Sequence, residues 1–195
     1  MKKFHEYMDV YRKQMEQGDI REAYKGLMEY LMKLKTDFKK KYPKFDVSGS
    51  LYYGYMDMSY FAVIPESLKL KKLKIAVVFC HDTCRFEVWL AGYNKQIQSQ
   101  YWNMFKENAN KESMENENPE KVNLKNKNTK SENIQNHRWN SYRIPPSLEG
   151  IDSIIECIID EHPDFRDLDA LTDQIEQTTL KFIKDVEDFL TKQIH

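Results

Sequence analysis

Two apolar segments near the middle of the chain, Leu73–Cys80 and Cys84–Ala91, constrain the fold more than any other feature of the sequence. Both are rich in β-branched and aromatic residues, which favour strands over helices. Only three residues, His81, Asp82 and Thr83, separate the two segments, and such a short polar connection suits a hairpin turn. The pattern therefore predicts a pair of antiparallel strands.

Polar and apolar side chains alternate along the second of these strands. Successive residues of a strand point to opposite faces of the sheet. One face therefore carries three apolar side chains and packs on the core: Phe86, Val88 and Leu90. The opposite face carries a cation, a carboxylate and an indole: Arg85, Glu87 and Trp89.

Two further strands are predicted upstream, over residues 45–53 and 55–64, where the period is also two and where Gly49 and Gly54 provide bends. Four residues of the second segment share one face: Met56, Met58, Tyr60 and Ala62. The other face carries Tyr55, Asp57, Ser59 and Phe61. Residues 138–144 resemble a strand that returns to the same sheet.

Helices are predicted wherever apolar residues recur every three or four positions. The first covers about residues 2–16, and Gly18 joins it to a second that begins at Asp19 and ends before Pro43, so the two form a hairpin. A third follows Asn94, a fourth covers residues 148–161, and a fifth extends from Leu168 to the C-terminus.

Residues 107–136 contain nine Asn, six Glu and five Lys, and too few large apolar side chains to offset the entropy of ordering them. We expect a flexible insertion there. The chain as a whole is predicted to be one α+β domain spanning residues 1–195. It has an N-terminal helical hairpin, an antiparallel sheet of four to five strands, and C-terminal helices packed on one face.

The formal net charge of −1 gives no global electrostatic reason to expect a nucleic-acid binder. No apolar run approaches the length of a membrane span, and three cysteines fit a reducing compartment, so a cytoplasmic protein is expected. Charge is nevertheless uneven. Residues 33–44 contain six Lys and one Asp, whereas residues 149–188 contain thirteen acidic and three basic residues, which favours solvated helix faces or a partner surface.

The segment Cys80-His81-Asp82-Thr83-Cys84 contains metal-ligating and nucleophilic residue types. Its spacing differs from that of a zinc knuckle, and neighbouring strand residues point to opposite faces, so a turn flanked by two apolar thiols is the favoured interpretation over a metal site or a Cys–His nucleophile. No serine-hydrolase, zincin, P-loop or dinucleotide motif occurs, and no cofactor is predicted.

The candidate ligand-binding residues come from the polar strand face and from the helix start that follows it. Tyr55 and Asp57 on a neighbouring strand, together with Arg85, Glu87 and Trp89, have the composition of a ligand pocket. Asn94 and Lys95 begin a helix, where backbone amides attract anions or where Asn94 is simply a cap. The alternative for the strand face is a set of cross-strand ion pairs beneath a covering helix.

The chain resembles an uncharacterised bacterial family known as a domain of unknown function. The resemblance covers the first half of the sequence and is carried by these segments: residues 4–7, 18–20, 23–30, 47–50 and 54–58 and, above all, the run RFEVWLAGYNK at 85–95. It implies a small bacterial cytosolic protein. It implies no activity and no catalytic residues.

The leading functional hypothesis is a non-catalytic module that binds a partner protein or a small ligand on this sheet face. One alternative is an enzyme acting on a phosphorylated or nucleotide-like substrate, with Glu87 or Asp57 as general base and Lys95 or Arg85 holding the anion. Another is a weak nucleic-acid binder acting through Lys33–Lys44.

Overall fold

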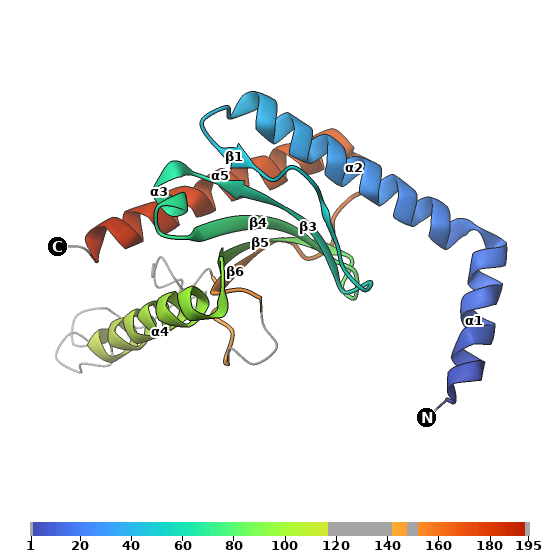
Figure 1. Cartoon of the computed structure of the whole chain (residues 1–195), viewed down its shortest axis with the longest axis horizontal. Helices are drawn as coiled ribbons and strands as arrows, with labels where there is room; N and C mark the ends of the chain where they lie inside the picture. The colour runs from blue at the N-terminus through green and yellow to red at the C-terminus, as the bar shows by residue number, and fades with distance from the viewer. Residues whose placement is uncertain (1, 117–141, 148–151, 194–195) are drawn as a thin grey trace, which may run out of the picture.

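The fold is built on one antiparallel sheet, and the computed structural model describes residues 2–116, 142–147 and 152–193 (Figure 1). The strands are arranged in the order β1-β3-β4-β5-β6, and β2 also pairs with β3. Their bounds are β1 Asp46–Val47, β2 Tyr52–Tyr53, β3 Met58–Ile64, β4 Leu73–Cys80, β5 Arg85–Gly92 and β6 Ile155–Asp160. The α+β class and the antiparallel sheet are confirmed.

The hairpin predicted from the sequence is the centre of this sheet. β4 and β5 pair along their whole length, from Cys80 opposite Arg85 to Leu73 opposite Gly92. Cys84 closes the turn with a φ of 52°, a left-handed conformation that is uncommon outside glycine.

The inner face of the sheet is covered by two long helices, α2 (Asp19–Lys41) and α5 (Leu168–Lys192), which lie side by side in Figure 1. Fully buried aromatic side chains from both layers fill the space between them: Phe38, Phe61, Phe86 and Phe182. The predicted apolar face of β5 is confirmed, because Phe86, Val88 and Leu90 all belong to this core.

Three shorter or more peripheral helices complete the described fold: α1 (Phe4–Gln17), α3 (Glu66–Lys69) and α4 (Lys95–Asn116). Phe105 of α4 stacks on Phe189 of α5 with ring centroids 4.3 Å apart, which attaches α4 to the core. Among the described residues, no helix combines the length and the apolar content that a membrane span requires.

The two N-terminal helices meet at Gly18, whose φ is 86°. Figure 1 shows α1 turning away from α2 instead of lying along it as in a closed hairpin. A single residue connects them, whereas helical hairpins use loops of about two to five residues. The connection is therefore too short to bring α1 back alongside α2.

The helix predicted over residues 148–161 is wrong for residues 152–161, the part of this range that the structure describes. Residues 155–160 form β6, which pairs with β5, and α5 is the one helix that follows it among the described residues. The isoleucines of this segment are β-branched and fit a strand at least as well as a helix.

Three further boundaries differ from prediction. The strand predicted over 45–53 is two short pieces, β1 and β2, and β3 begins only at Met58. Helix α4 continues to Asn116, so the first ten residues of the predicted flexible insertion are helical, and its remainder, 117–136, lies outside the described residues. Residues 138–141 of the predicted returning strand also lie outside them, while Arg143 forms a bridge with Glu156 of β6.

Candidate functional site

The outer face of the sheet is hollowed between two aromatic side chains. Tyr60 of β3 and Trp89 of β5 both point to this face. On β4, the strand between them, Ala76 lies directly opposite Trp89 and Val78 lies directly opposite Tyr60. The small side chain of Ala76 leaves a depression beside the indole ring. The resulting groove has a volume of about 690 Å³, and we call it the open-face groove.

Aromatic rings and a lysine form one wall of the open-face groove. Tyr52 stacks on Tyr60 with ring centroids 4.8 Å apart. Nζ of Lys74 lies 5.2 Å from the centroid of the Tyr60 ring and 3.4 Å from its hydroxyl oxygen. Such a cation over a ring face is a favourable electrostatic contact. The wall therefore combines flat apolar surfaces with a positive charge.

The other wall is the beginning of α4. Asn94 caps this helix, because its Oδ1 accepts a hydrogen bond from the amide of Ile97 at 3.0 Å. Lys95 follows in the first turn, and both residues line the groove. Asp152 also lines the groove and adds a negative charge at its margin.

Gln98 joins this helix to the end of β5. Its Oε1 accepts a hydrogen bond from the amide of Gly92 at 2.7 Å. Within the described part of the chain, its buried Nε2 has no acceptor. A Cβ on Gly92 would lie 2.6 Å from the amide nitrogen of Gln98, so only glycine allows the helix to start this close to the strand.

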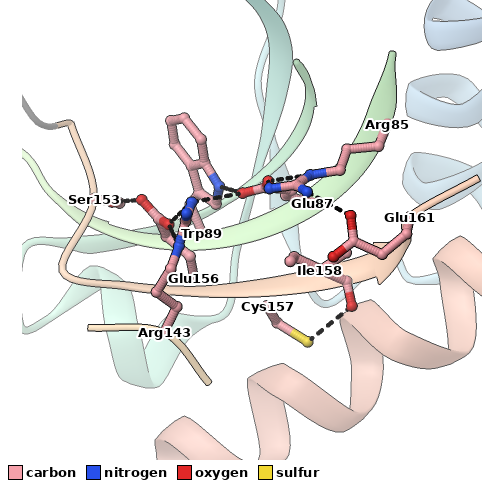
Figure 2. A network of polar contacts seen from close by, with 9 residues as sticks. All are labelled: Arg85, Glu87, Trp89, Arg143, Ser153, Glu156, Cys157, Ile158 and Glu161. Carbon is pink, nitrogen blue, oxygen red and sulfur yellow. Dashed lines mark hydrogen bonds and ion pairs between the residues drawn. The ribbon is translucent and has the colours of Figure 1, made fainter. Parts of the chain in front are cut away.

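Arg85, Glu87 and Trp89 lie on the outer face, as predicted, and form a connected set of contacts (Figure 2). Nε of Arg85 donates to Oε1 of Glu87 at 2.8 Å, and the indole nitrogen of Trp89 donates to Oε2 at 2.6 Å. The side chain of Glu87 is only 1% exposed. Both of its carboxylate oxygens are therefore occupied by protein donors.

The contacts continue onto β6 and the segment beside it. Arg143 lies 3.8 Å from Oε2 of Glu87 and also pairs with Glu156. Glu156 in turn accepts a hydrogen bond from the hydroxyl of Ser153. On the other side, Arg85 pairs with Glu161. We call this set, from Glu161 through Arg85 and Glu87 to Glu156, the β5–β6 polar network.

The polar network fixes the orientation of Trp89. Because the indole N–H is already bonded to Glu87, Trp89 offers the groove apolar ring surface and not a hydrogen-bond donor. Desolvation disfavours the charged form of Arg85, but the hydrogen bonds to Glu87 and Glu161 and their negative charges together outweigh it and raise the pKa of Arg85. The cross-strand ion pairs weighed as the alternative for this face are thus present beside the groove.

The structure divides the candidate ligand-binding residues predicted from the sequence into three sets. Trp89, Asn94 and Lys95 line the open-face groove, and Arg85 and Glu87 belong to the polar network next to it. Tyr55 and Asp57 lie in the turn before β3 and do not line the groove.

In that turn, the side chain of Tyr55 is 98% exposed. The carboxylate of Asp57 accepts a hydrogen bond from the amide of Met58 at 2.7 Å, so it stabilises the turn that precedes β3.

The residues weighed for metal binding are separated. Cys80 is buried on the outer face with Ala76 and Val78, and burial raises its pKa to about 12. His81 stacks instead on Tyr24 of α2. Within residues 2–116, 142–147 and 152–193, no three His, Cys, Asp or Glu side chains are grouped as metal ligands.

Several residues that line the groove were not predicted as site residues from the sequence, among them Tyr52, Tyr60, Lys74 and Asp152. For Lys74 a signal existed, because it is the one charged residue in the apolar segment 73–80 and shares a strand face with Ala76. The positions of Gln98 and Asp152 depend on how α4 and the segment before β6 return to the sheet. No local pattern encodes that arrangement.

The comparisons with known proteins identify one family. The model of a family described as a domain of unknown function, DUF7000, matches residues 4–125 and 121–190. No protein with a curated description and no solved structure matches the chain. The family match includes the first half, from which the resemblance was inferred, and extends to residue 190 in α5. The chain therefore belongs to the DUF7000 family of domains of unknown function.

Proposed function

We propose that this protein is a bacterial, cytosolic and non-catalytic binding module whose open-face groove takes a small ligand with a flat ring and an anionic group. The observation that carries the proposal is the ring of Trp89 beside the small side chain of Ala76, with the ring of Tyr60 lining the same groove. A ring stacked between or against aromatic side chains gains about 1–3 kcal/mol per stacked base in single-stranded nucleic-acid complexes. The groove volume of about 690 Å³ lies in the range typical of small-molecule sites.

The charges around the groove support an anionic group on the ligand. Lys74 and Lys95 approach it from two elements, and the positive end of the α4 dipole lies at the same wall. Asp152 opposes them at the margin. This balance favours a ligand with one compact anionic group over a polyanion.

The carboxylates proposed as general bases have other partners, and this supports binding over catalysis. Glu87 accepts hydrogen bonds from Arg85 and Trp89, and Asp57 accepts one from a backbone amide. The raised pKa of Cys80 keeps its thiol protonated near neutral pH, which disfavours a nucleophilic role.

Nucleic-acid binding through Lys33–Lys44 has weaker support. The ammonium group of Lys35 donates to the carbonyl of Gly49 at 2.8 Å, and Lys41 pairs with Glu176. Two of the six lysines in this segment therefore already have partners within the fold.

The proposal is tested with adenosine monophosphate as the probe, and with adenosine and inorganic phosphate as its separate halves. A ligand that binds the folded state raises the melting temperature, so the monophosphate should raise it more than either half alone. Ala76→Val fills the floor of the groove without removing the hydrogen bond between Trp89 and Glu87. We expect it to weaken binding at least tenfold.

The matched control is Ala62→Val, the same substitution directly opposite Ala76 on β3, at a residue that does not line the groove. It should leave binding unchanged. Lys74→Met should weaken binding of the monophosphate but not of adenosine. The proposal fails if no planar anion in a wider metabolite panel stabilises the protein. It also fails if Ala76→Val and Ala62→Val bind the monophosphate equally well.

A further inference from the structure

Helix α1 carries an apolar stripe that the described part of the chain leaves largely uncovered. The stripe consists of Phe4, Tyr7, Met8, Tyr11 and Met15, and no residue of the helix is buried. Phe4 is 79% exposed, Tyr7 51% and Tyr11 54%. Helices of this length are marginally stable in water without packing partners, so an uncovered stripe of this kind marks an interaction surface.

A second, almost wholly apolar pocket of about 870 Å³ lies where α1 meets α2 and the turn end of the sheet. We call it the hairpin-end pocket. Its walls include Ile20 and Tyr24 of α2, Phe79 of β4, and Phe165, which lies just before α5. Tyr11 and Met15 of α1 also line it, so the stripe and the pocket form one continuous surface.

The stripe and the pocket cannot cover each other within one chain, because the single residue Gly18 joins α1 to α2 and holds α1 away from it. We propose that the occupant of the hairpin-end pocket is helix α1 of a second copy of this chain, in a symmetric dimer in which each α1 lies in the pocket of its partner. A two-fold axis requires a self-complementary surface, and a stripe that leads into a groove is one.

The exposed area is sufficient for such a dimer. With about 200 Å² for each aromatic side chain, the exposed fractions of Phe4, Tyr7 and Tyr11 leave about 350 Å² of aromatic surface per chain. Two stripes and the lining of two pockets then bury about 1,200 Å² in total, which is the lower end of the range of about 1,200–2,000 Å² for stable interfaces.

Gly26 provides a close approach for the incoming helix. It lies on α2 and lines the pocket, and a Cβ placed there has no atom within 4 Å. The single chain therefore accepts a side chain at this position, whereas a docked helix does not. Gly26→Lys distinguishes the single chain from the dimer, because the lysine side chain fills the pocket that the partner helix would occupy. The substitution should not destabilise the single chain, since glycine is a poor helix former.

The test is the mass of the full chain in solution, measured by sedimentation equilibrium up to about 100 μM, well above the Kd of a micromolar complex. Wild type should sediment at about 47 kDa, twice the 23.4 kDa of one chain. Tyr7→Glu and Gly26→Lys should each give the monomer mass. Leu70→Glu is the matched control, because Leu70 is also highly exposed but lies outside the stripe and the pocket, and it should remain dimeric.

Reaction of Cys84 with a thiol reagent gives an independent result. Cys84 lines the pocket and is exposed in the single chain, so it should react several-fold faster in Tyr7→Glu than in wild type. A wild-type monomer at every concentration overturns the proposal. So does a dimer that survives both Tyr7→Glu and Gly26→Lys, because its interface lies elsewhere. Stabilisation of a monomeric wild type by an apolar small molecule, lost in Gly26→Lys, would replace the second copy with that ligand.

Discussion

Arg85 and Glu87 lie two residues apart on the outer face of β5, and Nε of Arg85 donates a hydrogen bond to Oε1 of Glu87 at 2.8 Å. The two side chains are 15% and 1% exposed, so this pair is largely removed from water. Since Glu87 also accepts the indole N–H of Trp89, one buried carboxylate connects the ionic network to the wall of the open-face groove.

Removal of the Glu87 carboxylate is expected to destabilise the fold. Glu87→Ala leaves the Arg85 guanidinium partly buried without its main partner and the Trp89 indole without an acceptor. Breaking a buried pair costs about 3–5 kcal/mol, and because Arg85 keeps Glu161 we expect a loss near the lower end of that range, about 3 kcal/mol. Urea unfolding of wild type and of Glu87→Ala measures this loss in the free energy of unfolding.

Glu161→Ala is the control for this prediction. Glu161 pairs with the same guanidinium but is 57% exposed, so its removal should change the free energy of unfolding by less than about 1 kcal/mol. Equal losses in Glu87→Ala and Glu161→Ala would show that burial of the carboxylate contributes little.

Stability is expected to fall on mild acidification because of His81. Burial lowers the pKa of His81 from its ordinary 6.5, although the charges of Asp57 and Asp82 oppose this. The folded state then binds the proton less readily than the unfolded state. The stability contributed by the neutral imidazole of His81 is complete above pH 6.5 and is lost as the pH falls through the lowered pKa.

The measurement is the free energy of unfolding from pH 7.5 to 5 in wild type and in His81→Gln. The wild-type slope should exceed that of the variant only below about pH 6.5, by at most about 1.4 kcal/mol per pH unit. His162→Gln alters an exposed imidazole and is the matched control. If the free energy of unfolding changed equally with pH in wild type and in His81→Gln, the assignment of this pH dependence to His81 would be contradicted.

Gly92 is expected to be essential for the wall of the groove formed by α4. In Gly92→Ala, the new Cβ would lie 2.6 Å from backbone of Gln98, so the first turn of the helix must move. We expect a loss of about 1–3 kcal/mol, typical of overpacking, and weaker ligand binding in the groove. At Gly49, by contrast, a Cβ has no atom within 4 Å, and Gly49→Ala should be nearly neutral. Thermal unfolding of Gly92→Ala and Gly49→Ala measures this difference in stability.

The central strands could be predicted from the sequence because their information is local. Each residue of β5 alternates between a core face and a polar face, and this pattern specifies both the strand and the direction of Arg85, Glu87 and Trp89. The stripe of α5 is likewise local, with Ile175, Phe182, Val186 and Phe189 at helical spacing and all buried.

The segment that forms β6 could not be assigned from the same rules. Its pairing with β5 contains a register shift near Phe86 and Glu87, which leaves Ile159 as an extra residue. Ile155 and Ile159 are both buried, but side chains four positions apart share a face in a regular strand as well as in a helix, so this spacing does not distinguish the two. The pairs Ile154–Ile155 and Ile158–Ile159 recur at helical spacing, and the extra residue interrupts the strict alternation that would have identified a strand.

The open-face groove depends on tertiary relationships for the same reason. Lys74 and Trp89 approach each other because β4 and β5 pair in one particular register. Gln98 and Asp152 reach the groove from segments more than fifty residues apart in sequence. A local pattern predicts which face a side chain occupies, but not which distant residues join it.

The most direct test of the binding proposal is to map the contact surface of a ligand by nuclear magnetic resonance, with adenosine monophosphate added to isotope-labelled wild-type protein. The account predicts shifts of the backbone signals of Lys74, Ala76 and Lys95 and of the Trp89 indole, and no comparable shifts at Tyr24 or Phe165 in the hairpin-end pocket. Absence of shifts at the open-face groove with this probe and with every other planar anion of the panel, or shifts confined to the hairpin-end pocket, would contradict it.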